Sequence, residues 1–126
     1  MVVDDDPMVL FVFRDTLRDL GDAYEIVTTQ SGLKALNEIR NKPFDLVITD
    51  LNMPDLDGVA LTEAIRQTSP DTVVAWITAY GCHSRSADAA RLEIYRCYDK
   101  PLEVDEILQI ALGALGIESV HDKSQR

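Results

Sequence analysis

The sequence has no long apolar run, and its N-terminus lacks the basic-then-apolar order of a secretion signal. A membrane-spanning helix needs about 20 apolar residues in a row, so we expect no membrane segment and a cytoplasmic location. Basic residues are also scarce: 12 Lys and Arg stand against 22 Asp and Glu, giving a formal net charge of -10. Because nucleic-acid binding depends on attraction to phosphates, this balance argues against direct contact with DNA or RNA.

Cysteine is rare too, and the only two are Cys82 and Cys97. They have neither CxxC spacing nor His83 or His121 at metal-ligand intervals. Cytosolic thiols are normally kept reduced. We therefore expect two reduced, structural cysteines, and disfavour the alternative of a disulfide or redox switch.

What the sequence does contain is the composition and pattern of one folded domain. Its 126 residues are 46% apolar and 27% charged, as in ordinary globular proteins. Short apolar runs rich in β-branched residues predict strands at residues 1–3, 24–28, 46–49, 73–78 and 94–98. Stretches of helical spacing separate them, which predicts a doubly wound α/β fold with a mostly parallel sheet. We expect the domain to span residues 1–117, and residues 118–126 to be a polar tail or the start of a linker.

Helix boundaries are marked where this scheme needs them. Pro7 suits a first helical turn, Ser31 suits an N-cap, and Asp105 places negative charge early in the last helix. Gly21 and Gly116 mark helix exits.

Polar residues lie at the carboxyl ends of four of the predicted strands. Asp4, Asp5 and Asp6 follow the first strand, Asp50 follows the third, Thr78 ends the fourth, and Lys100 follows the fifth. In open α/β sheets a ligand crevice forms outside these ends, so we expect the carboxylates to converge. Clustered carboxylates repel one another unless a cation compensates, and hard oxygen ligands suit Mg²⁺ better than zinc or copper.

Such a site is suited to phosphoryl transfer, which depends on positioning and on neutralising charge. Asp50 is the best-placed nucleophile, Thr78 can donate a hydroxyl hydrogen bond to a phosphoryl oxygen, and Lys100 can pair with another. Each residue alone is more simply explained as a cap, turn or loop residue. Coincidence explains their joint placement poorly.

The motifs that carry these residues resemble those of a known family. Val2-Val3-Asp4-Asp5-Asp6-Pro7, Asp50-Leu51-Asn52-Met53-Pro54-Asp55-Leu56-Asp57-Gly58, Thr78-Ala79 and Lys100-Pro101 are similar, in order and spacing, to the signature of response-regulator receiver domains of two-component signalling. The resemblance covers nearly the whole chain, from Val2 to about Leu115.

This resemblance implies a flavodoxin-like (βα)5 fold with strand order 2-1-3-4-5. It also implies a phosphorylation-dependent switch, in which Asp50 is the phosphoacceptor for a sensor histidine kinase or phosphotransfer protein and Thr78 and Lys100 contact the phosphoryl group. Mg²⁺ would be bound by Asp5, Asp50 and the backbone carbonyl of Asn52, with Asp4 acting through water. The chain would catalyse only its own phosphorylation and dephosphorylation. Gly58 is expected to relieve a tight backbone bend.

The family couples phosphorylation to the face formed by its fourth helix, fifth strand and fifth helix, through the threonine and an aromatic residue three positions before the lysine. Here the threonine is Thr78 and the aromatic position holds Cys97. Tyr98 is next to it, but in a regular strand Tyr98 points to the opposite side. We therefore assign Thr78, Cys97 and Tyr98 to the switch without a settled mechanism. This face is also a possible homodimer contact.

Two other functions stay open. A Mg²⁺-dependent phosphohydrolase with an aspartyl nucleophile needs similar parts, but Asn52 stands where its second acid would be expected. A receiver-shaped module that works by protein contacts alone would not need Asp5, Asp50, Thr78 and Lys100. We also expect that the chain is joined to an output or kinase domain in a longer protein.

Overall fold

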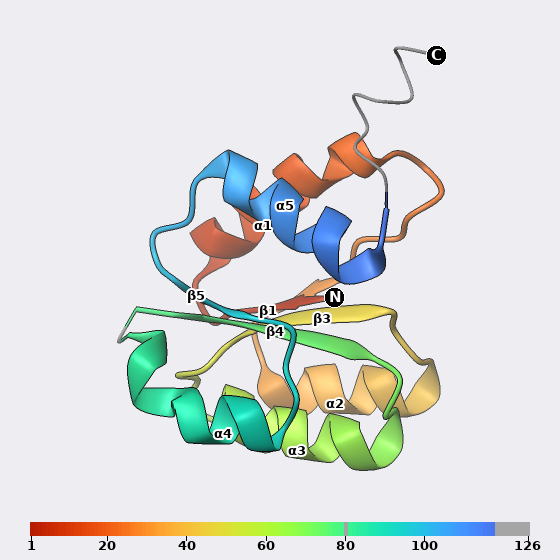
Figure 1. Cartoon of the computed structure of the whole chain (residues 1–126). Coiled ribbons are helices and arrows are strands. Elements are labelled where there is room, and N and C mark those ends of the chain that lie inside the picture. Colours follow the sequence, from red (N-terminus) through yellow and green to blue (C-terminus); the bar gives the residue numbers. More distant parts are fainter. Residues whose placement is uncertain (80, 118–126) are drawn as a thin grey trace.

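The computed structural model describes residues 1–79 and 81–117, which form five parallel strands between two layers of helices (Figure 1). The predicted tail at residues 118–126 lies outside the described residues. The elements, in chain order, are β1 (Val2–Val3), α1 (Pro7–Leu17), the 3-10 turn η1 (Arg18–Leu20), β2 (Thr28–Thr29), α2 (Gly32–Asn41), β3 (Leu46–Asp50), α3 (Gly58–Thr68), β4 (Val73–Thr78), the 3-10 turn η2 (Cys82–Arg85), α4 (Ser86–Arg91), β5 (Cys97–Asp99) and α5 (Val104–Leu115).

The strand order is β2-β1-β3-β4-β5, which confirms the predicted doubly wound, flavodoxin-like fold. β4 matches its predicted range, β1 and β3 differ from theirs by one residue, and β2 and β5 differ by more. β2 contains only Thr28 and Thr29, because its partner β1 is just two residues long and offers no further ladder. β5 begins at Cys97 rather than at residue 94, although the N–H of Tyr95 already donates to the carbonyl of Val74.

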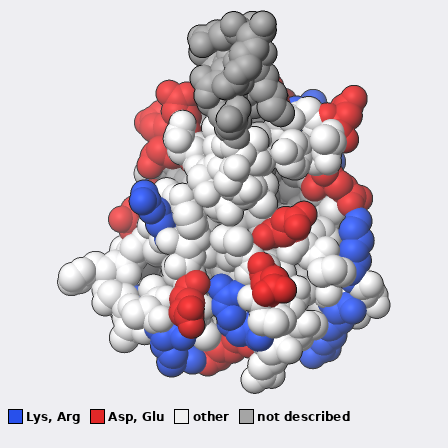
Figure 2. Space-filling view, turned by 45° about the vertical axis from the view of Figure 1, so that its right-hand side comes forward, with Lys and Arg blue, Asp and Glu red and all other residues white. Residues whose placement is uncertain are grey.

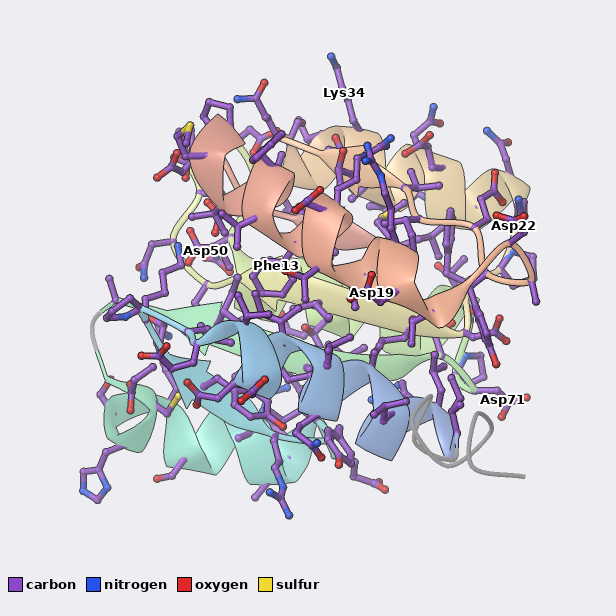
Figure 3. The ribbon with its side chains drawn as sticks, turned by 90° about the horizontal axis from the view of Figure 1, so that it is seen from above. Phe13, Asp19, Asp22, Lys34, Asp50 and Asp71 are labelled. Carbon is purple, nitrogen blue, oxygen red and sulfur yellow. A yellow bond between two sulfur atoms is a disulfide. The ribbon has the colours of Figure 1, made fainter. Side chains whose placement is uncertain are left out.

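Two hydrophobic cores fill the layers on either side of the sheet. Helices α1 and α5 cover one face, where Phe13 is buried against the sheet (Figures 1 and 3). Helices α2, α3 and α4 cover the other face, where Trp76 of β4 is completely buried. The indole N–H of Trp76 donates to Thr62 Oγ1 at 2.9 Å, which satisfies a donor that would be costly to bury unpaired. Both faces of the central strands are therefore apolar, as expected for a parallel sheet.

Helix caps lie where the sequence marked them, and others appear as well. Pro7 occupies the first turn of α1, and Ser31 caps α2 by accepting from the N–H of Lys34. Glu103 and Glu106 form a reciprocal capping box at the start of α5, and Gly116 ends that helix in the left-handed conformation. These caps fix where each helix starts relative to the strand before it.

Among the described residues, no helix is both long and apolar enough to cross a membrane. Acidic and basic side chains are interspersed on the face drawn in Figure 2. This face therefore does not carry the concentrated positive charge that a nucleic-acid surface needs.

Candidate phosphoacceptor site

Three carboxylates meet at the carboxyl ends of β1 and β3. Oxygens of Asp4, Asp5 and Asp50 all lie within 4.8 Å of one another. Asp4 and Asp50 are buried, whereas Asp5 is exposed. Figure 3 shows Asp50 at one end of the sheet, with Asp22 and Asp71 toward the other end. The structure thus brings together the acidic residues that the sequence predicted at these strand ends.

Two of the three consecutive acidic residues after β1, Asp4 and Asp6, accept backbone hydrogen bonds with different consequences. Asp4 Oδ1 accepts from the N–H of Asp6 at 2.9 Å, which turns the chain out of the strand. Asp6 in turn caps α1, since its Oδ1 accepts from the N–H of Met8 at 2.9 Å. Sequence reasoning missed this cap, although an acidic residue directly before Pro7 is a standard helix-start signal.

Lys100 lies inside the same cluster. Its Nζ is 2.7 Å from Asp4 Oδ2 and 3.5 Å from Asp50 Oδ1. Burial alone would lower the pKa of the Lys100 ammonium, but the bond to Asp4 and the charge of Asp50 outweigh burial and raise the pKa above its ordinary value. Lys100 therefore keeps its positive charge at the site at neutral pH.

Asp50 is less favourably placed as an anion. Burial raises the pKa of its carboxyl, and repulsion from Asp4 raises the pKa further. The charge of Lys100 and a hydrogen bond from the backbone N–H of Asn52 oppose this shift without cancelling it. One lysine is thus too little positive charge for the cluster, and a second cation would be stabilised there.

The donor set fits a small hard cation. Asp4 Oδ2 is buried and lies 2.7 Å from Lys100 Nζ, its ion-pair partner. With Asp5 and Asp50 close by, the site offers carboxylate oxygens of the kind that Mg²⁺ binds. The acidic pocket is therefore suited to a divalent metal.

Thr78 and Asn52 are the remaining residues that the sequence assigned to the site. The N–H of Lys100 donates to the carbonyl of Thr78 at 2.8 Å, so the ends of β4 and β5 are joined beside the carboxylates. The side-chain amide of Asn52 donates to Thr78 Oγ1 at 3.3 Å. The Thr78 hydroxyl is therefore close to the loop that follows Asp50, where the sequence predicted it.

Gly58 has a different role from the one predicted. Its φ angle is not in the left-handed region, so no tight bend requires glycine there. Instead, an added Cβ would overlap the carbonyl oxygen of Asp50 and lie 2.9 Å from Leu51 Cα. The start of α3 packs directly on the backbone of Asp50, and only glycine permits this approach.

Asp55 was not singled out in the sequence but anchors the loop after Asp50. Its carboxylate accepts from the Ser31 hydroxyl and from the N–H groups of Gly32 and Leu33, at the start of α2. The hydrogen bond from Ser31 is the main cause that lowers the pKa of Asp55 to about 2. Because Asp55 and Ser31 are 24 residues apart, no local sequence signal indicates this contact.

The expectation of reduced cysteines is wrong. Cys82 and Cys97 form a disulfide, with their Cα atoms 5.7 Å apart. The crossover from β4 to β5 through η2 and α4 brings together two residues that are 15 positions apart. Rules based on CxxC spacing do not detect this proximity. Cys97 packs toward the core under α3 and Tyr98 toward the core under α5, as strand alternation predicted.

Comparison with known proteins gives one family. The sequence model of the response regulator receiver domain matches residues 1–112. The transcriptional regulatory protein GlrR of Escherichia coli is 32% identical over 115 residues, which are 91% of this chain and 26% of GlrR. The sensor histidine kinase RcsC of Salmonella typhi is 33% identical over 109 residues, which are 86% of this chain and 11% of RcsC.

Solved structures agree. The crystal structure of the receiver domain of NtrX from Brucella abortus superposes with a TM-score of 0.82 at 28% identity, and the match covers 93% of this chain and 98% of that one. The chain spans about a quarter of the length of GlrR and about a tenth of that of RcsC, so both relatives carry further parts. On its sequence and its fold, the chain belongs to the family of response regulator receiver domains.

Proposed function

We propose that this receiver domain is a signalling switch in which Asp50 accepts a phosphoryl group from the phosphohistidine of a partner kinase or phosphotransfer protein. The observation that carries the proposal is the buried carboxylate of Asp50, which lies within 4.8 Å of oxygens of Asp4 and Asp5 and 3.5 Å from Lys100 Nζ. A nucleophile flanked by cation ligands and a fixed positive charge is what phosphoryl transfer requires.

In the proposed step, a carboxylate oxygen of Asp50 attacks the phosphorus in line with the bond to the donor nitrogen. An acyl phosphate forms, the phosphorus–nitrogen bond breaks, and the imidazole leaves with its electron pair. Lys100, 3.5 Å from Asp50, pairs with one phosphoryl oxygen. The Thr78 hydroxyl donates to another. Bound by Asp5, Asp50 and the Asn52 carbonyl, with Asp4 acting through water, Mg²⁺ would neutralise charge on the transferred group.

The chain's own part in this chemistry is limited to receiving and losing the phosphoryl group. It holds a nucleophile, but position 52 carries an amide rather than the second acid that turnover of a phosphomonoester would use. We therefore propose that it acts through conformation, and that an output or kinase domain of a longer protein uses the signal, as the greater lengths of GlrR and RcsC suggest.

The test is phosphorylation by a small phosphodonor with Mg²⁺, followed by intact mass measurement. The wild-type chain should gain one phosphoryl group, and Asp50→Asn should gain none. Asp57→Asn is the matched control: Asp57 lies in the same loop but caps α3, and Asn caps equally well. It should be labelled like the wild type.

Two results would contradict the proposal. If the wild type gains no mass, Asp50 is not a phosphoacceptor under these conditions and the function is wrong. If Asp50→Asn is still labelled, another carboxylate accepts the group. Lys100→Ala should keep part of the labelling, because the lysine stabilises the product but does not form the bond.

A further inference from the structure

The disulfide joins the two ends of the segment that contains α4. Cys82 is the first residue of η2, and Cys97 is the first residue of β5. Both residues are partly exposed, and thiol–disulfide exchange depends on access from solvent. The crosslink therefore encloses residues 83–96 in a covalent loop on the surface of the domain.

Besides the crosslink, this segment is held by a small apolar anchor and by surface contacts: Leu92 is buried, and Ala89 and Ile94 pack against the core. No residue of α4 itself is buried. Arg91 pairs with Glu63 of α3 at 3.0 Å, and both side chains are about half exposed. Arg66 Nε donates to the carbonyl of Leu92 at 2.8 Å, and Leu92 is the buried anchor. Exposed ion pairs contribute little stability, so α4 depends on few contacts to hold its place.

The crosslink also lies next to the phosphoacceptor site. Cys82 follows Thr78 by four positions, and Cys97 precedes Lys100 by three. The N–H of Cys82 donates to Asp99 Oδ1 at 2.9 Å, a second contact between the loop and the end of β5. Any movement of the chain beyond Thr78 must therefore move Cys82, which the disulfide fixes to the strand that leads to Lys100.

We propose that Cys82 and Cys97 form a thiol–disulfide exchange site that gates the response of residues 83–96 to phosphorylation. The proposal rests on Asp50 being the phosphoacceptor. In the disulfide form the segment stays fixed when a phosphoryl group on Asp50 contacts Thr78 and Lys100. In the dithiol form the same event displaces α4, because the hydrogen bond from the N–H of Cys82 to Asp99 then takes the place of the covalent tie between the start of the segment and β5.

The redox partner is a small disulfide, or its dithiol or monothiol form. A cysteine thiolate attacks one sulfur of the small disulfide, forming a mixed disulfide and releasing one thiolate. The second cysteine thiolate then attacks the bonded cysteine sulfur, closes the Cys82–Cys97 bond and releases the second thiolate. Two electrons pass from the protein to the small disulfide, and the two cysteine protons end on the two released thiols. Reduction is the reverse.

The experiment uses the 126-residue chain in two forms, oxidised with glutathione disulfide and reduced with excess glutathione. N-ethylmaleimide trapping should label both cysteines in the reduced form and neither in the oxidised form. Each form is then labelled at Asp50 with the small phosphodonor and examined by amide hydrogen exchange. We expect phosphorylation to change exchange in residues 83–96 by about tenfold in the reduced form and by less than about twofold in the oxidised form.

Cys82→Ser with Cys97→Ser is the control, and it should respond like the reduced wild type in both buffers. If both forms are phosphorylated and residues 83–96 respond equally, or respond in neither, the gating proposal is wrong. Failure of glutathione to reduce the folded chain would overturn the exchange site. Absence of phosphorylation in both forms would instead refute the function on which the proposal rests, so the two failures are distinct.

Discussion

The acidic site and the segment from Cys82 to Cys97 are neighbours, but they are held in place by different means. The site is positioned by strand ends: Asp50, Thr78 and Lys100 have their places because β3, β4 and β5 pair in register. The segment is positioned by one covalent bond, by the buried side chain of Leu92 and by contacts that are mostly exposed. A site fixed by the sheet keeps its geometry for chemistry, whereas we propose that the segment moves more easily once its crosslink is reduced.

The electrostatics of the two regions differ as well. At the site, buried like charges make the unliganded state unfavourable, and burial raises the pKa of Asp50. In the segment, Arg91 bonds to both Glu63 and Asp88, and its pKa is raised by the Asp88 hydrogen bond. The difference indicates where energy is available for switching: a cation relieves repulsion at the site, and we propose that the segment responds to phosphorylation there.

The largest effect on stability should come from opening the crosslink. Reduction removes a constraint between residues 15 positions apart, which by loop-closure entropy should lower the free energy of unfolding by about 3 kcal/mol. Urea unfolding with and without reductant measures this difference. The double variant Cys82→Ser with Cys97→Ser should be insensitive to reductant, and equal midpoints for the oxidised and reduced wild type would contradict the expectation.

At the site, Gly58→Ala should destabilise the fold by about 1–3 kcal/mol, because its methyl group overlaps the Asp50 backbone. Gly113→Ala in α5 is the matched control. Its added Cβ meets only the hydroxyl end of Tyr95, an exposed side chain that can turn away, and alanine favours the helix. Thermal unfolding of both variants measures the contrast. Equal losses would show that the backbone contact at Asp50 is not the cause.

Asp50→Asn is expected to have a smaller effect in metal-free buffer, and this effect is a gain in stability rather than a loss. Because the folded-state pKa of Asp50 is raised above 3.8, its ionisation opposes folding at neutral pH. The variant should be more stable there by on the order of 1 kcal/mol or less, or roughly 3 °C in Tm. The gain should fade as pH falls through the raised pKa and vanish below 3.8, where the acid is neutral in both states.

Adding Mg²⁺ gives a second comparison of the stability of the wild type and Asp50→Asn. It should stabilise the wild type and leave Asp50→Asn nearly unchanged, since the variant lacks one cation ligand. A variant that is less stable than the wild type in chelator at neutral pH would show that Lys100 and the Asn52 N–H outweigh the burial of Asp50.

The smallest effect concerns Asp55, which ties the loop after Asp50 to α2. Its lowered pKa means that it stabilises the fold above pH 3.8 and that this contribution is lost as pH falls toward about 2. Asp55→Asn should be slightly less stable than the wild type at neutral pH, with the two converging below about 2. Solvent screening keeps the difference small.

Acid titration of the unfolding midpoint measures the Asp55 contribution. Asp22→Asn, at the other end of the sheet in Figure 3, serves as the control. A constant gap between Asp55→Asn and the wild type down to pH 2 would mean that Asp55 acts by shape rather than by charge.

The fold class and the set of residues at the strand ends could be predicted from the sequence, because they follow from local periodicity and from the rule that the carboxyl ends of parallel strands share one edge. The strand order was implied by the family resemblance. The positions of Pro7 and Ser31 at helix starts could also be predicted, because a helix cap depends on residues within one turn.

The contacts between residues far apart in the chain could be seen in the folded structure but not in the sequence. The pairing of Cys82 with Cys97, the hold of Asp55 on α2, and the packing of Gly58 on the Asp50 backbone each depend on where separate elements meet. Local composition does not encode these distances, since they result from the register of strands and the packing of helices across the sheet. The residues of the candidate site could therefore be predicted from the sequence, whereas the contacts that hold the neighbouring segments in place could not.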